Sequence, residues 1–300
     1  MELRQLHYFV KVAETLNFSE AARSLFVTQS TLSQQIKQLE EELGIVLFSR
    51  DSHSVSLTEN GERLFPLAQK TLLDAKDCIN QIRDLQEMVS GELIIGATYS
   101  FGPILTETLR NFLDTYPGVK LQIIIRSMEE LMNMLCRREV DFVLAFKPNR
   151  TFDEVESLTL FDDRLSVILS KDHALSGRTS LSLADLQRQN IVMPAKGLQA
   201  RNALDKYVDI YNMDWNIRIE LNEVNMLLDV VQGSHFLTIL SESAIHHRDS
   251  LKAIPLELPD NQMEGCIHLL KRVYRKKSAK VFLKMLRESN EVSTRNNRWI

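Results

Sequence analysis

Polar side chains between Phe18 and Arg50 show the clearest chemical pattern in this chain. Five of them recur at the spacing of one helix face: Gln29, Ser30, Ser33, Gln34 and Lys37. Glutamine can pair with adenine in the DNA major groove, serine with several base edges, and lysine with guanine or phosphate. The opposite face carries Leu32, Ile36 and Leu39, which would pack against a core. The pattern predicts a DNA-recognition helix, and an ordinary surface helix with a polar outer face is the common alternative.

A shorter helix and a tight turn are predicted just before the recognition helix. Ala21 and Ala22 give this shorter helix a small apolar face that allows close packing, and Ser19 is placed to cap it. Thr28 is placed to cap the recognition helix, and Gly44 to end it. Two helices joined by a short turn, the second carrying base-reading side chains, predict a helix-turn-helix unit.

Three segments within the first 64 residues carry a family resemblance: LRQLHYFVKVAETLNFSEAARSL, TQSTLSQQIKQLEEELGIVLFSR and SVSLTENGERL. They resemble the amino-terminal domain of LysR-type transcriptional regulators, and the later chain resembles that family in layout. The resemblance implies a winged helix-turn-helix followed by a two-lobed domain similar to periplasmic binding proteins. It also implies an assembly of paired subunits, either a homodimer or a homotetramer.

Charge is unusual for a DNA-binding segment, because residues 1–57 hold five Lys or Arg and seven Asp or Glu. Phosphate contacts dominate the affinity for DNA, so DNA-binding segments are usually basic. Affinity would therefore come from a few well-placed cations, from hydroxyl contacts, and from a dimer that binds two DNA half-sites at once. Thr31, Arg50 and His53 complete the predicted contact set. His53 lies at the predicted wing tip, where it would reach DNA or stay in a solvated loop.

Length and composition predict a cytoplasmic protein of two or three domains, since the chain has 300 residues and is 44% hydrophobic. No run of about 18 apolar residues predicts a membrane span, and MELRQLHYF does not read as a secretory signal. The three cysteines, Cys78, Cys136 and Cys266, are widely separated. This spacing excludes a zinc finger, and the odd number argues against a disulfide framework. Packed or surface thiols are favoured over a redox-sensing pair.

A long helix is predicted to begin after its cap, Thr58, and to reach about Met88. Eight of its residues alternate at spacings of four and three: Leu64, Ala68, Thr71, Ala75, Cys78, Ile82, Leu85 and Val89. This is the period of a coiled coil, and charged residues flank it. Pairing with a second copy is favoured over packing on the same domain, because the first sixty residues offer little surface to cover this stripe. A bend or helix restart is expected at Pro66.

From Glu92 onward strands and helices alternate, which predicts parallel sheets covered by helices on both sides. The predicted strands are Leu93–Ala97, Lys120–Ile125, Asp141–Phe146, Leu165–Leu169, Ile191–Met193, Ile217–Leu221, Phe236–Leu240 and Cys266–Arg272. The fold predicted for the whole chain is therefore a mainly α winged helix-turn-helix, a long linker helix and a two-lobed α/β effector domain. The predicted boundaries are 1–58, 59–90 and 91–291 with a tail at 292–300; lobe I is 91–161 with 265–291, and lobe II is 162–264.

Ligands bind at the carboxyl ends of parallel strands, where loops and helix amino-termini converge. That rule, together with the family resemblance, selects eight candidates for an effector site: Thr98, Tyr99, Ser100, Ser127, Phe146, Leu198, Gln199 and Arg201. Hydroxyls and helix-terminal amides favour an anion, and the guanidinium of Arg201 could hold a carboxylate. Three of these residues also have a structural alternative: Ser100 as a helix cap, Ser127 as the cap of a helix with Glu130 completing a capping box, and Arg201 as a partner of Asp205.

The sequence predicts a DNA-binding transcriptional regulator controlled by a small, anionic metabolite bound between the lobes. A constitutive regulator with a vestigial cleft and a cytoplasmic small-molecule binding protein are the alternatives. No enzyme motif, metal-ligand spacing or cofactor motif is present in the sequence, so neither catalysis nor a cofactor is expected. The predicted partners are double-stranded DNA with an interrupted inverted repeat, the small-molecule effector, a second copy of the chain and RNA polymerase, with no membrane.

Overall fold

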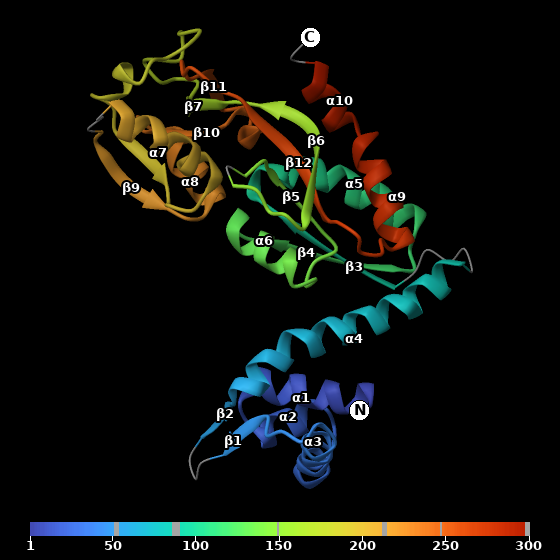
Figure 1. The fold of residues 1–300 in the computed structure, drawn as a ribbon. Coiled ribbons are helices and arrows are strands. Elements are labelled where there is room, and N and C mark those ends of the chain that lie inside the picture. Colours follow the sequence, from blue (N-terminus) through green and yellow to red (C-terminus); the bar gives the residue numbers. More distant parts are fainter. Residues whose placement is uncertain (51–53, 86–90, 149, 212–214, 247, 298–300) are drawn as a thin grey trace. The chain divides into compact units, whose positions relative to one another are not determined.

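The computed structural model describes residues 1–300 except 51–53, 86–90, 149, 212–214, 247 and 298–300 (Figure 1). The chain divides into two compact units, residues 1–88 and residues 89–300. Each unit has its own hydrophobic core, and each is described separately below. The domain boundaries given above stay a prediction.

The first unit is a helical domain with a two-stranded wing. Its elements are α1 (Leu3–Thr15), α2 (Phe18–Ser24), α3 (Gln29–Leu43), β1 (Phe48–Arg50), β2 (Val55–Leu57) and α4 (Glu59–Leu85). The strands β1 and β2 are antiparallel, with Phe48 opposite Leu57. Phe48 packs between Phe9 and Phe18 at ring-centroid distances of 5.4 and 5.6 Å. These aromatic contacts fix the wing to the helices that carry α3.

The caps of α2 and α3 show how the helix-turn-helix is set. The prediction that Ser19 caps α2 was wrong: Asn17 is the cap, and its Oδ1 accepts from the amides of Ser19 and Glu20. An Asn before the helix reaches these first-turn amides, which a Ser already inside the helix cannot do. The cap at Thr28 is confirmed, since its Oγ1 accepts from the amide of Thr31 at 3.2 Å. Gly44 ends α3 in the left-handed conformation, as predicted.

The long helix α4 begins after Thr58, whose Oγ1 accepts from the Gly61 amide at 3.1 Å. The expected helix restart at Pro66 is not present, because α4 runs through this residue. The first part of the predicted stripe packs inside its own domain: Ala68 is buried, with Leu64 and Leu72 against the same core. Further along α4 the stripe is uncovered in this chain: Ile82 is 61% exposed, and Ile79, which lies beside the predicted stripe, is 55% exposed.

The second unit contains two five-stranded sheets, which we call the first and second lobes (Figure 1). The first lobe has strand order β4-β3-β5-β12-β6. Its elements are β3 (Gly91–Ala97), a 3₁₀ helix η1 (Tyr99–Phe101), α5 (Gly102–Thr115), β4 (Val119–Ile125), α6 (Met128–Cys136), β5 (Phe142–Phe146), β6 (Val155–Asp163), β12 (Met263–Leu270), α9 (Lys277–Arg287) and α10 (Asn290–Asn297). The capping box that opens α6 is confirmed, because Ser127 and Glu130 each bond the other's backbone amide.

The second lobe has strand order β11-β7-β10-β8-β9. Its elements are β7 (Leu165–Ser170), η2 (Ala184–Leu186), β8 (Ile191–Pro194), α7 (Gln199–Tyr211), β9 (Ile217–Leu221), α8 (Val224–Val231), β10 (Leu237–Ser241), η3 (Glu242–Ile245) and β11 (Leu251–Pro255). The chain passes from β6 of the first sheet directly to β7 of the second, and it returns at β12.

The expectation of all-parallel sheets holds only in part. Strand β12 is antiparallel to both β5 and β6, and β7 is antiparallel to both β10 and β11. The sequence pattern did not predict β6, β11 or α10. Strand β6 mixes buried with exposed residues and β11 mixes buried with half-buried residues, which gives a weaker signal than the fully buried β5 and β7.

Helices cover both faces of the first sheet. Phe142, Leu144 and Phe146 of β5 belong to the core beneath α5 and α9, whereas Val143 and Ala145 belong to the core beneath α6. This alternation follows the two-residue period of a strand, so β5 is buried on both faces. Buried strands of this kind end at the edge where the two lobes meet, and they position the site described next.

Candidate functional site

Helix α3 presents the predicted base-reading side chains at the surface of the first unit. Leu32, Ile36 and Leu39 are fully buried. The remaining face is open: Gln29, Ser30, Thr31, Gln34 and Lys37 are exposed, and Ser33 is half-buried. The hydroxyls of Ser30 and Thr31 lie 2.9 and 2.8 Å from Thr28 Oγ1, which orders the helix amino-terminus.

Local contacts account for several of the acidic residues near this surface. Glu40 Oε1 accepts from the amides of Leu47 and Phe48 at 2.7 and 3.2 Å, so this carboxylate supports the turn into the wing. Glu41 lies 3.5 Å from Lys37, and both side chains are largely exposed. Such an exposed pair contributes only about 0–1 kcal/mol, so Lys37 can exchange Glu41 for phosphate at little cost.

Phe26, in the turn between α2 and α3, was not among the predicted site residues. Its side chain is 96% exposed, and its backbone has φ of 55°, in the left-handed region. Phenylalanine rarely adopts this conformation, and an exposed aromatic ring gains nothing from folding. The exposure follows from the turn geometry, which residue types alone did not reveal. Of the two predicted wing contacts, His53 lies outside the described residues, and only the backbone of Arg50 is described.

A cavity of about 680 Å³ lies where the two lobes meet. Its walls include the start of α6, the end of β5, the start of α7 and the chain before β12. The lining residues are Ser127, Met128, Glu129, Phe146, Lys147, Pro148, Arg150, Gly197, Gln199, Asn202, Ala203, Lys206, Asp260, Gln262, Met263 and Glu264. Three predicted residues, Ser127, Phe146 and Gln199, are therefore brought together in one cavity.

The cavity contains balanced charges. Lys147 Nζ lies 2.7 Å from Glu264 Oε1, and Arg150 lies 3.5 Å from Glu129. The hydrogen bond from Lys147 lowers the pKa of Glu264, which also accepts from Thr159 at 3.0 Å. The same hydrogen bond to Glu264 raises the pKa of Lys147, which favours the charged form of the lysine. Lys206 and Asp260 add one further charge of each sign to the lining.

Gln199 joins the two lobes across the inner wall of this cavity. Its side-chain Nε2 donates to the carbonyl of Phe146 at 2.7 Å, and its Oε1 accepts from the Phe146 amide at 3.1 Å. The carboxamide thus pairs with both polar atoms of one buried backbone residue. A second bridge joins Ser100 and Ser241, whose hydroxyl oxygens lie 3.1 Å apart. We call these two contacts the interlobe clasps.

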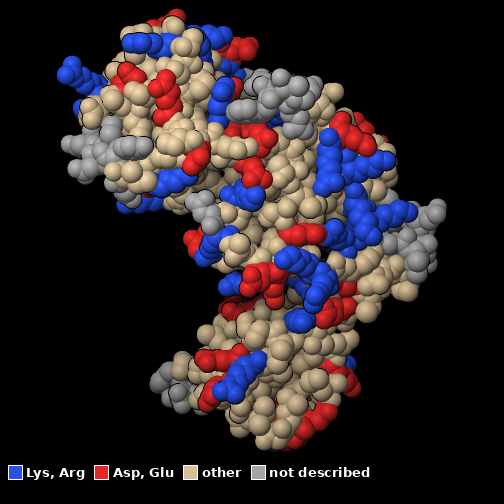
Figure 2. Space-filling model, turned by 45° about the horizontal axis from the view of Figure 1, so that its top comes forward, with Lys and Arg blue, Asp and Glu red and all other residues tan. Residues whose placement is uncertain are grey.

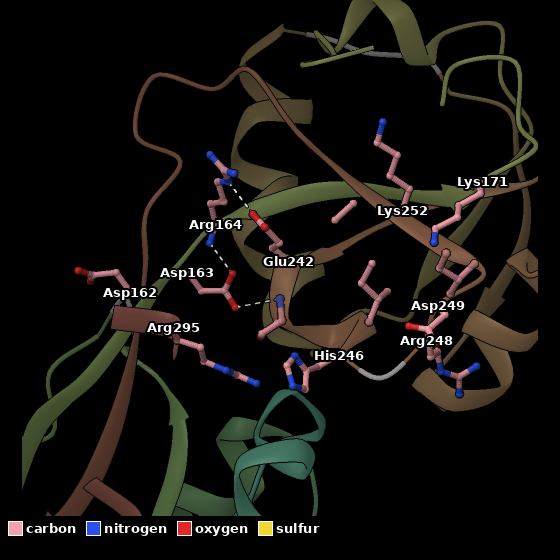
Figure 3. A pocket seen from close by; sticks show the side chains of 14 residues that line it. Asp162, Asp163, Arg164, Lys171, Glu242, His246, Arg248, Asp249, Lys252 and Arg295 are labelled. Carbon is pink, nitrogen blue, oxygen red and sulfur yellow. Dashed lines mark hydrogen bonds and ion pairs between the residues drawn. The ribbon is translucent and has the colours of Figure 1, made fainter. Parts of the chain in front are cut away.

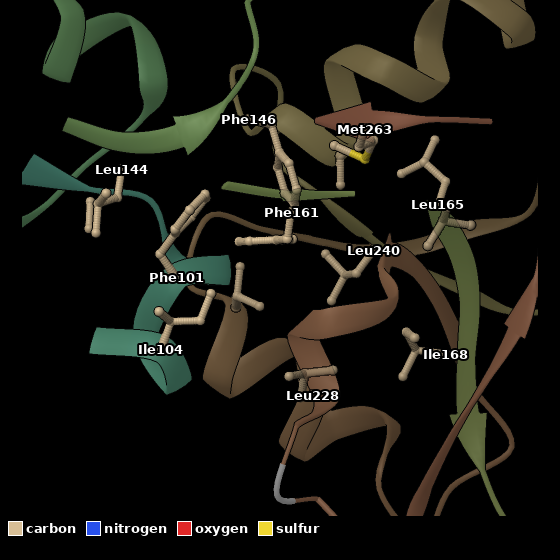
Figure 4. Packing of buried hydrophobic residues seen from close by; sticks show 14 of the residues in the cluster. Phe101, Ile104, Leu144, Phe146, Phe161, Leu165, Ile168, Leu228, Leu240 and Met263 are labelled. Carbon is tan, nitrogen blue, oxygen red and sulfur yellow. The ribbon is translucent and has the colours of Figure 1, made fainter. Parts of the chain in front are cut away.

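Phe101, Phe146 and Phe161 form an aromatic cluster within the hydrophobic core of the second unit (Figure 4). Phe101 packs against Phe146 and Phe161 at 5.7 and 5.3 Å between ring centroids. Gly265, on β12, lies directly beneath the Phe161 ring, and an added Cβ would lie 2.5 Å from that ring. Only glycine allows this approach, so Gly265 positions an aromatic wall between the lobes.

The other five predicted effector residues do not line the cavity. Thr98 and Ser100 are 3% and 1% exposed, and Leu198 packs against the hydrophobic core. The hydroxyl of Tyr99 is buried, and desolvation strongly raises its pKa. Ser100 is engaged in its clasp with Ser241, and the other three side chains are buried or packed against the core, so none of the four reaches the cavity in this arrangement of the lobes.

Arg201 is held by acidic residues of its own lobe, in agreement with the alternative in which it is a partner of Asp205. Its side chain is 10% exposed and forms ion pairs with Asp205 at 2.5 Å and Glu220 at 3.1 Å. Its Nη1 also donates to the carbonyl of Pro194 at 3.2 Å. The guanidinium therefore fastens α7 to β8 and β9.

Replacing Arg201 by methionine is expected to lower the free energy of unfolding by about 1–3 kcal/mol. The loss stays below that of a fully buried pair, because Asp205 and Glu220 are 32% and 46% exposed and can regain water. Thermal unfolding of the full-length protein measures the change. The exposed Lys206→Met, on the same helix, is the matched control and should leave stability nearly unchanged. An Arg201 variant of normal stability that no longer responds to effector would return this residue to the ligand site.

A second cavity, of about 600 Å³, lies beside the β6–β7 passage and η3 (Figure 3). Arg164 and Glu242 are ion-paired there at 2.8 Å. Asp163 accepts from the Ser243 amide at 3.3 Å, and burial raises its pKa. His246, just after η3, lies 2.8 Å from Glu291 of α10. Helix amino-termini and carboxyl ends of strands converge at the first cavity, which makes it the candidate ligand site.

Cys78 and Cys136 are exposed and Cys266 is buried; none of them is paired. Burial raises the pKa of the Cys266 thiol to about 11, which makes it a poor nucleophile. Within the described ranges no group of three or more His, Cys, Asp or Glu is placed to hold a metal ion. No described helix is long and apolar enough to cross a membrane.

A winged helix-turn-helix joined to a two-lobed domain with an interlobe cavity defines a DNA-binding regulator with a sensor domain. Residues 3–62 match the family model "Bacterial regulatory helix-turn-helix protein, lysR family". Residues 86–291 match the model "LysR substrate binding domain". The chain therefore belongs to the LysR family of transcriptional regulators, which are not enzymes.

Individual relatives agree with this assignment. The chain is 32% identical over 251 residues to the HTH-type transcriptional regulator AlsR of Bacillus subtilis, covering 81% of this chain and 82% of the relative. It is 31% identical over 207 residues to a RuBisCO operon transcriptional regulator of Allochromatium vinosum, covering 69% and 68%. A full-length OxyR variant from Pseudomonas aeruginosa has a similar structure, with a TM-score of 0.72, 25% identity, and 97% and 96% coverage.

Proposed function

We propose that this LysR-family regulator senses a small carboxylate-bearing metabolite in the cavity between its lobes. The observation that carries the proposal is the Gln199 clasp on the wall of that cavity. A carboxylate placed there would accept from the Phe146 amide, as Gln199 Oε1 does at 3.1 Å. The carboxylate would also accept from the side-chain Nε2 of Gln199, which would then no longer donate to the Phe146 carbonyl. Lys147, Arg150 and Lys206 supply the surrounding positive charge.

The clasp suggests how binding would reach the DNA. Without ligand, the two hydrogen bonds of Gln199 and the Ser100–Ser241 contact hold one arrangement of the lobes. A ligand that takes over one partner of Gln199 favours another arrangement only by the difference in its affinity for the two. The ligand would thereby release the Ser100 hydroxyl from its clasp and open access to the buried Thr98. This mechanism keeps these two residues as candidates for the ligand-bound state.

We propose that the open face of α3 reads the major groove, with Gln29, Ser30, Ser33 and Gln34 at base edges. Thr31, Lys37, Arg50 and His53 would contact phosphates, and the exposed Phe26 joins this surface. Two copies would pair through α4, so that the operator is an interrupted inverted repeat. The first turns of α4 pack against the core of their own domain. The proposed dimer seam therefore consists of later residues of the helix: Thr71, Ala75, Cys78, Ile79 and Ile82. RNA polymerase stays a predicted partner of the DNA-bound assembly.

Gln199→Leu is expected to remove both clasp hydrogen bonds while keeping the side-chain volume. The variant should lose its response to the effector by about tenfold or more, because the carboxamide no longer distinguishes two lobe arrangements. The effector is first sought by thermal shift of the full-length protein against a panel of small carboxylic acids, since a ligand of the native state raises the melting temperature. Transcription from an operator-driven reporter then measures the response of each variant.

Gln187→Leu, an exposed glutamine of the same lobe, serves as the control and should respond normally. If Gln199→Leu still responds at the wild-type effector concentration, the role given to the clasp is wrong. If no carboxylic acid shifts the melting temperature and the wild type regulates constitutively, the cleft is vestigial.

A further inference from the structure

The most basic stretch of the chain is residues 271–287, more than 200 residues after the recognition helix in the sequence. This stretch holds eight Lys or Arg and no Asp or Glu. By contrast, residues 1–88 hold nine Lys or Arg and thirteen Asp or Glu, so the unit that reads DNA carries a net negative charge. Figure 2 shows Lys and Arg side chains gathered over the part of the second unit that contains α9.

The basic residues of this stretch include two groups with different surroundings. Arg275 and Lys276 are structural: Arg275 is paired with Glu156, and Lys276 lies 2.8 Å from Asp141 and also donates to the Glu92 carbonyl. Lys280, Lys284 and Arg287 are exposed, and no described carboxylate lies within ion-pair distance of any of them. We call these three residues the α9 cation row.

The row lies on one face of a rigid helix. Positions 280, 284 and 287 follow the four- and three-residue spacing that places side chains on the same side of a helix. The opposite side of α9 is buried through Ala279, Phe282 and Leu286. The Phe282 ring packs against Phe112 and Phe142 at centroid distances of 5.1 and 5.9 Å. The three cations are therefore held as a preorganised array about 10 Å long, from the rise of 1.5 Å per residue.

Ordinary helix stabilisation explains only part of this row. Cations in the last turn interact favourably with the helix dipole, which accounts for Lys284 and Arg287. Lys280 lies in the middle of the helix, and its spacing of four residues from Lys284 brings two like charges together. An array that repels itself and has no described carboxylate partner fits a polyanion outside the chain.

We propose that the α9 cation row binds the phosphate backbone of duplex DNA flanking the operator. Duplex DNA carries one negative charge per about 1.7 Å of axis, so a row of about 10 Å can meet several phosphates. Such contacts carry no sequence information and supply salt-dependent affinity. They would compensate for the negative charge of the unit that reads the bases. The alternative occupant is the acidic first unit of a second copy, and the experiment distinguishes the two.

The test compares operator duplexes with and without about 20 flanking base pairs on each side, the operator being selected from a random duplex library. Full-length wild-type protein should bind the long duplex more tightly and with the steeper salt dependence. Lys280→Gln, Lys284→Gln and Arg287→Gln together should remove this advantage and lower the slope of log K against log salt by about 2–3 for each subunit whose row contacts the duplex. Sequence preference should not change.

Two matched variants accompany the triple substitution. Arg178→Gln, Arg188→Gln and Lys196→Gln remove three exposed cations from the second lobe and should leave the advantage of the long duplex intact. Lys280→Arg, Lys284→Arg and Arg287→Lys keep the charge and should retain the slope, which separates loss of charge from loss of fold. A glutamine triple with the wild-type slope on the long duplex overturns the proposal. A triple that changes the oligomeric state by light scattering without DNA assigns the row to a second copy instead.

Discussion

Ser33→Ala with Gln34→Ala is expected to weaken specific operator binding by about 1–3 kcal/mol for each base-edge interaction that the substitutions remove. Gln34 is exposed on the face of α3 opposite the buried Leu32 and Ile36, and the half-buried Ser33 lies at the edge of that face. Alanine preserves the helix and the buried face, so the effect falls on base recognition and not on folding. Binding to the selected operator and to duplexes with single base changes gives both the affinity and the sequence preference.

The double variant should also accept altered operators that the wild type rejects, because phosphate contacts remain. Gln187→Ala with Thr179→Ala removes similar groups from exposed positions in the second lobe and should change neither quantity. Unchanged affinity and preference in the α3 variant would falsify the assignment of this face to the major groove.

Ile79→Asp with Ile82→Asp should convert the protein to monomers and weaken operator binding by a factor of about 10²–10⁴, since two linked half-site contacts become one. These side chains are 55% and 61% exposed in the isolated chain, beside and on the uncovered part of the α4 stripe. Placing two carboxylates in a paired apolar seam leaves buried charges without partners. Light scattering measures the mass, and operator titration measures the affinity.

Lys76→Asp with Gln81→Asp is the matched control, because both residues are exposed and flank the stripe on either side. It adds the same two carboxylates and should leave the assembly unchanged. A stable dimer of the Ile79 and Ile82 variant would show that the seam lies elsewhere.

The sequence alone determined the local features of this protein. Thr28 as the cap of α3, Gly44 at its end and the capping box of Ser127 with Glu130 were all predicted and confirmed. These features depend on interactions over three or four residues, which the order of residue types already specifies. The family could also be predicted from the sequence, because the residues that carry the resemblance lie within one continuous segment, the helix-turn-helix and its wing. The predicted cap of α2 was wrong by two residues, since Asn17 and not Ser19 caps this helix.

The tertiary structure decided how distant segments meet. No local pattern shows that β12 inserts antiparallel between β5 and β6, because the whole second lobe separates β12 from these two strands in the chain. The role of Arg201 depended on Glu220, which β9 brings to 3.1 Å. The Gln199 clasp needed the Phe146 backbone from the other lobe. Part of the α4 stripe likewise proved to be covered by its own domain. A side chain's chemistry is written in the sequence, but its partner and exposure are set by packing, and these determine whether it supports the fold or remains available to a ligand.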